Sequence, residues 1–191
     1  MSKPVIIGIT GKKESGKSTI SNYLANHYGY TEFAFADTLK LTCMEIFKLN
    51  SQQLFGKQSD KEQIDNYWNV SPRVIMQEVG YAIREVGKRV PELDHIWIRS
   101  VHRQIELKKY DRVVISDVRY EDEVNSIREY EKKGWNVLII KVVRDGDTNI
   151  DTHESESQII PCDYIIYNNF TRQVLFQNVQ QILNEYINNL L

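Results

Sequence analysis

Eight residues near the N-terminus have the types and spacing of a phosphate-binding loop. Gly11, Gly16, Lys17 and Ser18 fill every constrained position of the pattern G-x-x-x-x-G-K-[ST]. The glycines let the backbone curl so that successive N–H groups face phosphate oxygens, and the helix that follows adds the positive end of its dipole. A lysine at this position reaches the β and γ phosphates of a nucleotide, and the hydroxyl ligates magnesium. The loop therefore predicts a site for ATP with Mg²⁺.

The surroundings of the loop agree with this prediction. An apolar, β-branched run at residues 5–9 precedes it and a helical pattern follows over residues 18–27, which is the strand-loop-helix context that the motif requires. A glycine-rich turn with a solvated lysine is the competing interpretation, and this context disfavours it. The residues predicted to contact ATP here are Gly11, Lys13, Glu14, Ser15, Gly16, Lys17, Ser18 and Thr19.

A carboxylate stands at the end of another apolar run. Asp117 follows residues 113–115 closely, and open α/β sheets bind their ligands at the carboxyl ends of strands. An acid at a strand end of a P-loop protein can hold a magnesium-bound water, so Asp117, through water, joins Ser18 as a predicted metal contact. Its alternative role is to cap the helix that follows.

Positive side chains occur where a transferred phosphoryl group would need them. Such transfer is catalysed mainly by positioning and by spreading charge off the transferred group. Arg119 comes just after the strand-end acid, Arg144 ends a later apolar run, and Arg73 opens a helical segment. Each alone is more often a solvated arginine, but their shared placement favours a site. The predicted catalytic residues are Lys17, Asp117, Arg119 and Arg144.

The elements that must position these residues alternate along the chain. Apolar runs predict strands at residues 5–9, 113–115, 137–143 and 164–167, with 33–36 a weaker candidate. Helical patterns cover residues 18–27, 38–49, 72–88, 95–109, 120–133 and 171–191. This alternation predicts one α/β domain over residues 1–191, with the three-layer P-loop NTPase fold and a five-stranded parallel sheet.

Two stretches interrupt the alternation. Residues 54–93 contain helical segments but no strand pattern, which predicts a helical insertion above the sheet. Polar residues from 144 to about 160 predict a short lid beyond the fourth strand. Asp37 and Lys40 follow the run at 33–36 and so occupy another carboxyl-end position, with a capping acid and a surface lysine as the alternative.

Composition limits the classes of function. The 191 residues carry a formal net charge of -2, which argues against a general binder of nucleic acid or membrane surfaces, because positive charge holds those partners. Cys43 and Cys162 lie far apart, so neither a disulfide framework nor a zinc site is predicted. The apolar run near the N-terminus is too short for a signal peptide or a membrane span. We expect a soluble cytoplasmic protein.

A phosphate loop alone does not separate a kinase from a GTPase switch, an ATPase motor or an ATP-binding regulator. The sequence has neither an Asn-Lys-x-Asp segment for guanine recognition nor an Asp-x-x-Gly switch, which disfavours a GTPase. Asp117 is followed by Val118 and not by a second acid, which weakens the motor interpretation. A kinase is the class that remains best supported.

These residues resemble the deoxynucleoside monophosphate kinase family of bacteriophages and related large viruses, and the resemblance spans nearly the whole chain. The segments that carry it, in matching order, are residues 11–17, 35–40, 71–80, 115–123 and 153–156. The resemblance implies a nucleoside monophosphate kinase-like fold and ATP with Mg²⁺. It also implies transfer of the γ-phosphoryl group to a deoxynucleoside 5'-monophosphate, in the cytoplasm of the cell or of an infected host, by a homodimer.

Carried onto this chain, the resemblance implies contacts to the acceptor nucleotide by Asp37, Lys40, Arg73, Gln77, Arg119, Glu123 and Glu154. Gln77 lies one helical turn after Arg73 and so shares its face. Arg119 and Glu123 are likewise four residues apart on the helix expected after the strand-end acid, where an i,i+4 ion pair is the alternative. The resemblance also implies that the insertion at residues 54–93 binds the acceptor. Arg144 would contact ATP and would form the lid with residues 153–156, and Asn168 would lie near the adenine of ATP, although Asn also suits turns.

The chain departs from the family pattern at one position that bears on metal ligation, Ser18, and at two that bear on acceptor selectivity, Thr38 and Ser71. Ser18 replaces an Asp found in many phage members, Thr38 replaces the usual Pro, and Ser71 replaces a common Thr. Animal-type phosphomevalonate kinases share a similar loop and strand-end Asp-x-Arg and are the closest rival, although the helix with Arg73 and Gln77 favours a nucleotide acceptor. A nucleotide-binding regulator with slow ATPase activity is the rival from another class.

Overall fold

The computed structural model describes residues 3–145 and 160–188 of the chain. These residues fall into two compact units. The first unit contains both ends of the chain, Met1–Ala34 and Lys108–Leu191, and the second contains Phe35–Leu107. None of the helices within the described ranges is long and apolar enough to cross a membrane.

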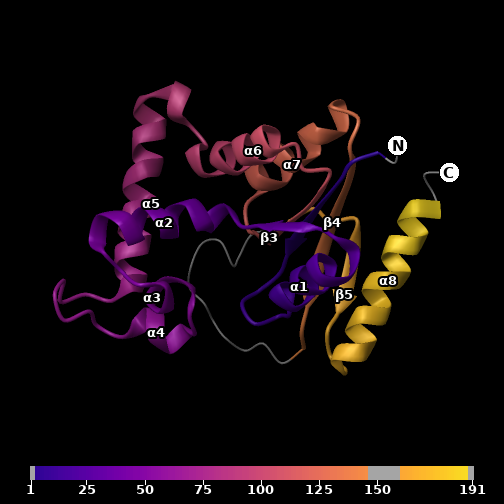
Figure 1. Cartoon of the computed structure of the whole chain (residues 1–191), viewed down its shortest axis with the longest axis horizontal. Coiled ribbons are helices and arrows are strands. Elements are labelled where there is room, and N and C mark those ends of the chain that lie inside the picture. Colours follow the sequence, from indigo (N-terminus) through magenta and orange to yellow (C-terminus); the bar gives the residue numbers. More distant parts are fainter. Residues whose placement is uncertain (1–2, 146–159, 189–191) are drawn as a thin grey trace. The chain divides into compact units, whose positions relative to one another are not determined.

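A parallel five-stranded sheet forms the centre of the first unit (Figure 1). The strands follow one another across the sheet in the order β2-β3-β1-β4-β5, and every neighbouring pair is parallel. Parallel strands are joined by helical crossovers, which cover both faces of the sheet. The strands are therefore buried on both faces, which accounts for their continuous apolar sequences. Their bounds are β1 (Val5–Thr10), β2 (Thr31–Phe33), β3 (Arg112–Val118), β4 (Asn136–Val143) and β5 (Tyr164–Tyr167).

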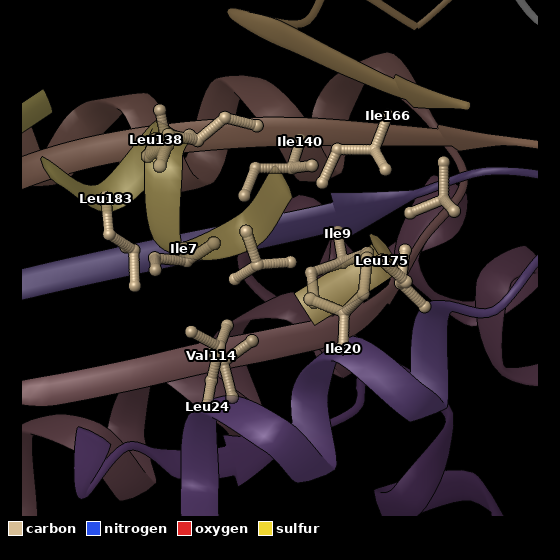
Figure 2. Packing of buried hydrophobic residues seen from close by; sticks show 13 residues of the cluster. Ile7, Ile9, Ile20, Leu24, Val114, Leu138, Ile140, Ile166, Leu175 and Leu183 are labelled. Carbon is tan, nitrogen blue, oxygen red and sulfur yellow. The ribbon is translucent and has the colours of Figure 1, made fainter. Parts of the chain in front are cut away.

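Helices cover the two faces of this sheet. On one face, α1 (Lys17–Tyr28) and α8 (Arg172–Asn188) close over alternate strand residues, and Figure 2 shows Ile7 and Ile9 of β1 packed with these helices. On the other face lies α7 (Glu121–Lys132), whose Ile127 approaches Gly8. The residues shared between sheet, α1 and α8 are Ile7, Ile9, Ile20, Leu24, Val114, Leu138, Ile140, Val142, Ile166, Leu175, Val179, Ile182 and Leu183.

The strand register brings four chain segments to one edge of the sheet. Thr10, the last residue of β1, is paired with Val118 of β3 and with Lys141 of β4, and Val143 of β4 is paired with Tyr167 of β5. The residues that follow β1, β3, β4 and β5 therefore begin side by side. The connection after β1 leads to β2 on one side of the sheet, and the connection after β3 leads to β4 on the other side. Open α/β sheets bind ligands where such connections diverge.

The second unit is helical. Its elements are α2 (Phe35–Phe47), α3 (Ser51–Phe55), α4 (Gln58–Glu62), α5 (Pro72–Arg89), the 3-10 turn η1 (Pro91–Leu93) and α6 (Ile96–Lys108), whose last residue belongs to the first unit. Their apolar centre consists of Cys43, Leu49, Leu54, Ile75 and Met76. A Cβ on Gly80 of α5 would lie 3.2 Å from Leu39 of α2, so the glycine lets these two helices approach closely.

The predicted fold class is confirmed, with corrections at β2. Five parallel strands are present, and the predicted helices correspond to α1, α2, α5, α6, α7 and α8. The weaker strand candidate at residues 33–36 is wrong in part, because β2 ends at Phe33 and α2 begins at Phe35. Asp37 in the first turn of α2 favours this early start, since a negative charge there complements the helix dipole. Every residue from 54 to 93 is described, and none is in a strand.

Replacing Ile140 by Ala should lower the free energy of unfolding by about 2–5 kcal/mol, because a fully buried Ile leaves a cavity between sheet and helices. The matched control is Ile165→Ala on the neighbouring strand β5, where the side chain is 49% exposed, and its loss should stay below about 1 kcal/mol. Urea unfolding of both variants measures the difference. Equal losses would show that the face under α1 and α8 is not the core of this unit.

Candidate active site

The phosphate loop connects β1 to α1 and depends on two glycines in left-handed backbone conformations. Gly11 has φ 144° and Gly16 has φ 111°. A Cβ on Gly11 would lie 2.3 Å from the carbonyl oxygen of Val142, and one on Gly16 would lie 2.4 Å from Nδ2 of Asn168. Both positions therefore exclude a side chain by conformation and by space.

Lys17 folds back across the loop that precedes it. Its Nζ donates to the carbonyl oxygens of Gly11, at 2.6 Å, and of Lys12, at 2.5 Å. The ammonium group is thereby held over the loop opening, next to the backbone that would surround a phosphate. A phosphate oxygen carries negative charge, so it attracts the ammonium group more strongly than a neutral peptide carbonyl does. The lysine is therefore placed to transfer its hydrogen bonds to a bound triphosphate.

Ser15 carries a hydroxyl that the protein itself does not satisfy. The residue is 1% exposed, and its Oγ has no hydrogen-bond partner among residues 3–145 and 160–188. Leaving a buried hydroxyl unpaired costs on the order of 1–3 kcal/mol. A phosphate oxygen in the loop would accept this hydrogen bond, so the site fits the triphosphate of ATP.

The other predicted loop residues surround this cradle. Glu14 adopts a left-handed conformation with φ 63°, and its carbonyl oxygen accepts a long hydrogen bond of 3.5 Å from Nη1 of Arg144. Ser18 is exposed in the first turn of α1. Thr19 donates its N–H to the carbonyl oxygen of Gly16 at 3.0 Å, and Lys13 is half-buried.

Ser18 and Asp117 offer oxygen ligands on neighbouring segments of the sheet edge. Asp117 is the second-last residue of β3 and is half-buried, and β3 pairs with the strand that leads into the loop. Magnesium is usually held by one or two protein oxygens together with phosphates and waters, so this donor set fits a nucleotide-bound Mg²⁺. Consistently, the described part of the chain has no cluster of three or more His, Cys, Asp or Glu residues that could hold a metal by itself.

The structure corrects the expected relation between Arg119 and Glu123. Helix α7 begins at Glu121, so Arg119 precedes the helix and does not share a helical face with Glu123. Instead Oε2 of Glu123 accepts the backbone N–H of Arg119 at 2.7 Å and that of Tyr120 at 3.1 Å. Glu123 is 7% exposed and fixes the backbone that carries the exposed Arg119.

The environment of Glu123 favours its protonated form. Burial raises the pKa of its carboxyl to about 8, the N–H bonds from Arg119 and Tyr120 oppose the rise, and the negative charges of Asp117 and Asp122 add to it. Only the ionised carboxylate brings a full negative charge close to Asp117. The protonation state of Glu123 therefore affects the charge of the sheet edge where the metal contact is predicted.

Two asparagines after β5 connect this strand to other parts of the edge. Nδ2 of Asn168 donates to the carbonyl oxygen of Ser15 at 2.8 Å. Asn169 accepts the N–H of Asp145 at 2.8 Å and donates to its Oδ2 at 2.5 Å. The first contact reaches the phosphate loop, and the second holds the residue that follows Arg144.

The acceptor residues predicted in the second unit form a group of their own. Asp37 and Lys40 make an ion pair of 2.8 Å within α2, and Nζ of Lys40 lies 4.8 Å from the ring centroid of Phe55. On α5, Nη2 of Arg73 donates to Oε1 of Gln58 at 2.6 Å. Lys40 and Arg73 thus contact the two ends of the short segment 55–58.

Sequence reasoning missed two of these partners, Phe55 and Gln58, which carried no motif although both fall in the helical insertion. Asn168 was predicted near adenine, and its side chain contacts the backbone of the phosphate loop. Gln77 is exposed on α5, one turn after Arg73 as predicted. Glu154 and most of the predicted lid lie outside the described residues.

The sheet order, the glycine-dependent loop after β1 and the acid at the end of β3 define a P-loop phosphotransferase. A solved Chloroflexus aurantiacus protein described as a candidate kinase supports this fold, with TM-score 0.51 and 15% identity over 97% of this chain and 98% of its own. No family model matches the sequence.

Comparison with curated proteins narrows the class. A protein of Acanthamoeba polyphaga mimivirus, described as a candidate deoxynucleotide monophosphate kinase, is 34% identical in an alignment that covers 92% of this chain and 94% of the viral protein. The deoxynucleoside-5'-monophosphate kinase of Escherichia phage T5 is 31% identical in an alignment that covers 62% of this chain and 46% of the phage protein. A dephospho-CoA kinase of Fusobacterium nucleatum is 26% identical in an alignment that covers 93% of this chain and 96% of the bacterial protein.

The chain belongs to the deoxynucleotide monophosphate kinase family, and it is an ATP-dependent phosphotransferase.

The pKa of Glu123 predicts how stability depends on pH. The carboxyl of Glu123 has a pKa of about 8 in the folded protein, compared with 4.5 for an ordinary glutamate. Between these two pH values the folded protein holds a proton that the unfolded chain has lost, so the free energy of unfolding should fall as the pH rises. From about pH 6 to pH 8.5, the free energy of unfolding of wild type should fall by about 2 kcal/mol more than that of Glu123→Gln, because the glutamine cannot ionise. Urea unfolding without nucleotide or metal measures this.

Glu121→Gln is the control for this experiment, because Glu121 begins the same helix but is exposed. This variant should follow the pH dependence of wild type. Superimposable curves for wild type and Glu123→Gln would contradict the assignment of a proton to Glu123.

Proposed function

We propose that this protein transfers the γ-phosphoryl group of Mg-ATP to the 5'-monophosphate of a deoxynucleoside and so makes a deoxynucleoside diphosphate for DNA synthesis. The observation that carries the proposal is the 34% identity to the viral deoxynucleotide monophosphate kinase candidate over more than nine-tenths of both chains. The similarity to the deoxynucleoside-5'-monophosphate kinase of phage T5 also supports it.

The first unit supplies the groups for the phosphoryl donor. Lys17 and the backbone of the loop would hold the triphosphate, with Ser15 donating its unsatisfied hydroxyl. Arg119 directly follows β3, and Arg144 directly follows β4, at the edge of the sheet from which the loop also starts. Both would spread charge off the transferred group. Magnesium held by Ser18 and, through water, by Asp117 would supply further neutralisation of the phosphates.

The second unit supplies groups suited to a nucleoside monophosphate. Arg73 presents a planar guanidinium that can bind a phosphate with two hydrogen bonds, and Gln58 already holds its Nη2. Gln77, one turn later on α5, can donate to and accept from a base edge. Asp37 and Lys40 add one acceptor and one donor on α2.

The proposed transfer is in line and forms no covalent intermediate with the protein. An oxygen of the acceptor monophosphate is already anionic and nucleophilic, so no strong general base is required. Positioning of two highly charged molecules and neutralisation of their charge then account for catalysis. The arginines and Lys17 perform both tasks.

Dephospho-CoA is a second candidate acceptor, because a dephospho-CoA kinase matches 93% of this chain at 26% identity. Its acceptor group is a hydroxyl, which must lose a proton during transfer. Asp117 is the carboxylate at the sheet edge that could take this proton. The two candidates therefore differ in whether the strand-end acid acts on the acceptor.

The decisive experiment measures ADP formation from Mg-ATP with each deoxynucleoside and ribonucleoside monophosphate, with dephospho-CoA, with phosphomevalonate and with no acceptor. Deoxynucleoside monophosphates should stimulate ADP formation and yield diphosphates, and Lys17→Ala should abolish the stimulation. If dephospho-CoA or phosphomevalonate alone stimulated ADP formation, that compound and not a deoxynucleotide would be the acceptor. ADP formation that is independent of any acceptor would indicate the nucleotide-binding regulator.

Arg73→Met should raise KM for the stimulating deoxynucleotide by about 10- to 100-fold, because it removes charge-assisted hydrogen bonds to the acceptor phosphate. KM for ATP should change by less than about twofold, since the ATP contacts lie in the first unit. Arg89→Met is the matched control, because this arginine ends the same helix and is exposed. Steady-state kinetics with each substrate varied in turn separate the two constants. An increase in KM for ATP alone would show that Arg73 contacts ATP and not the acceptor.

A further inference from the structure

Asn168 is rigidly placed between the sheet and the phosphate loop. Its backbone N–H donates to the carbonyl oxygen of Val143 at 2.7 Å, so the residue is tied to the carboxyl end of β4. Its side-chain Nδ2 donates to the carbonyl oxygen of Ser15 at 2.8 Å. One residue thus connects the end of β5, the end of β4 and the loop before α1.

The carbonyl that Asn168 holds belongs to a peptide whose orientation matters. In a planar trans peptide the C=O and the following N–H point in opposite directions. Holding the carbonyl of Ser15 toward Asn168 therefore directs the N–H of Gly16 away from Asn168. Glycine has little intrinsic preference between conformations of positive and negative φ, so this peptide needs an external contact to keep one orientation.

The helix after the loop does not provide that contact through a side chain. Gly16 is the N-cap residue of α1 and makes no side-chain cap. Asn168 packs directly on it, because a Cβ on Gly16 would lie 2.4 Å from Nδ2 of Asn168 and 3.8 Å from Leu175 of α8. The amide therefore fixes the loop both by a hydrogen bond and by contact.

We propose that Asn168 is a positioning residue for the phosphoryl donor: it orients the Ser15–Gly16 peptide so that the loop binds the triphosphate, and it acts independently of the nucleotide base. This inference rests on the proposed use of Mg-ATP at the loop, but not on the identity of the acceptor. It assigns to Asn168 a role different from the adenine contact that the sequence predicts. The neighbouring Asn169 contacts Asp145 and not the loop, so it serves as the matched control.

The test compares ATP with inorganic tripolyphosphate, which has the same phosphate chain and no base. Calorimetric titration in the presence of Mg²⁺ gives the affinity of each probe. Asn168→Leu keeps approximately the size of the side chain but removes the donor, and it should weaken both probes by a similar factor of about ten. Asn168→Asp places a carboxylate oxygen against the carbonyl of Ser15 and should weaken both further. Asn169→Leu should leave both affinities within about twofold of wild type.

Three outcomes would overturn the proposal. Weaker ATP binding with unchanged tripolyphosphate binding would assign Asn168 to the base. Wild-type affinities for both probes in both Asn168 variants would show that the contact with Ser15 has no role in binding. Wild type that binds neither probe would refute the proposed use of ATP at this loop and the inference with it. Partial unfolding would also weaken both probes by the same factor, so thermal unfolding of each variant without ligand must show that the protein stays folded at the temperature of the titration.

Discussion

The site of this protein depends on the parallel pairing of β1 with β3 on one side and β4 on the other. Since Thr10 and Val118, the last residues of β1 and β3, lie in register with Lys141 near the end of β4, the phosphate loop, the strand-end acid and the segment with Arg144 start from one edge. The loop approaches β4 so closely that a Cβ on Gly11 would meet the carbonyl of Val142. The apolar contacts of the sheet with α1 and α8 hold this edge in place.

Polar contacts at the carboxyl ends of the strands hold main-chain groups of the site. Asn168 ties the loop to β5, and Glu123 fixes the backbone on which Arg119 stands. Each uses a side chain to hold a main-chain group, and such contacts preorganise a site before any ligand binds. The hydroxyl of Ser15 remains for the ligand. The edge is therefore built mainly as a rigid anion cradle, which suits a reaction catalysed by position and charge.

The second unit has a different character. Its candidate residues form pairs among themselves, Asp37 with Lys40 and Arg73 with Gln58. Charged groups held by such partners stay ordered without a ligand. A binding surface of this kind can be altered residue by residue without changing the phosphate loop. The names of two relatives that match more than nine-tenths of this chain give different acceptors, a deoxynucleotide monophosphate and dephospho-CoA.

Local pattern by itself determined the phosphate loop, the buried strands and the long helices, because glycine spacing, β-branched runs and helical periodicity are properties of neighbouring residues. The strand end at Phe33 escaped this reasoning, since the helix start at Phe35 competed for the same apolar residues. Only the tertiary structure placed Asn168 against Ser15, 153 residues away, and turned Glu123 back onto the N–H of Arg119. Such contacts depend on strand register and on the direction of each side chain, which the order of residue types along the chain does not specify.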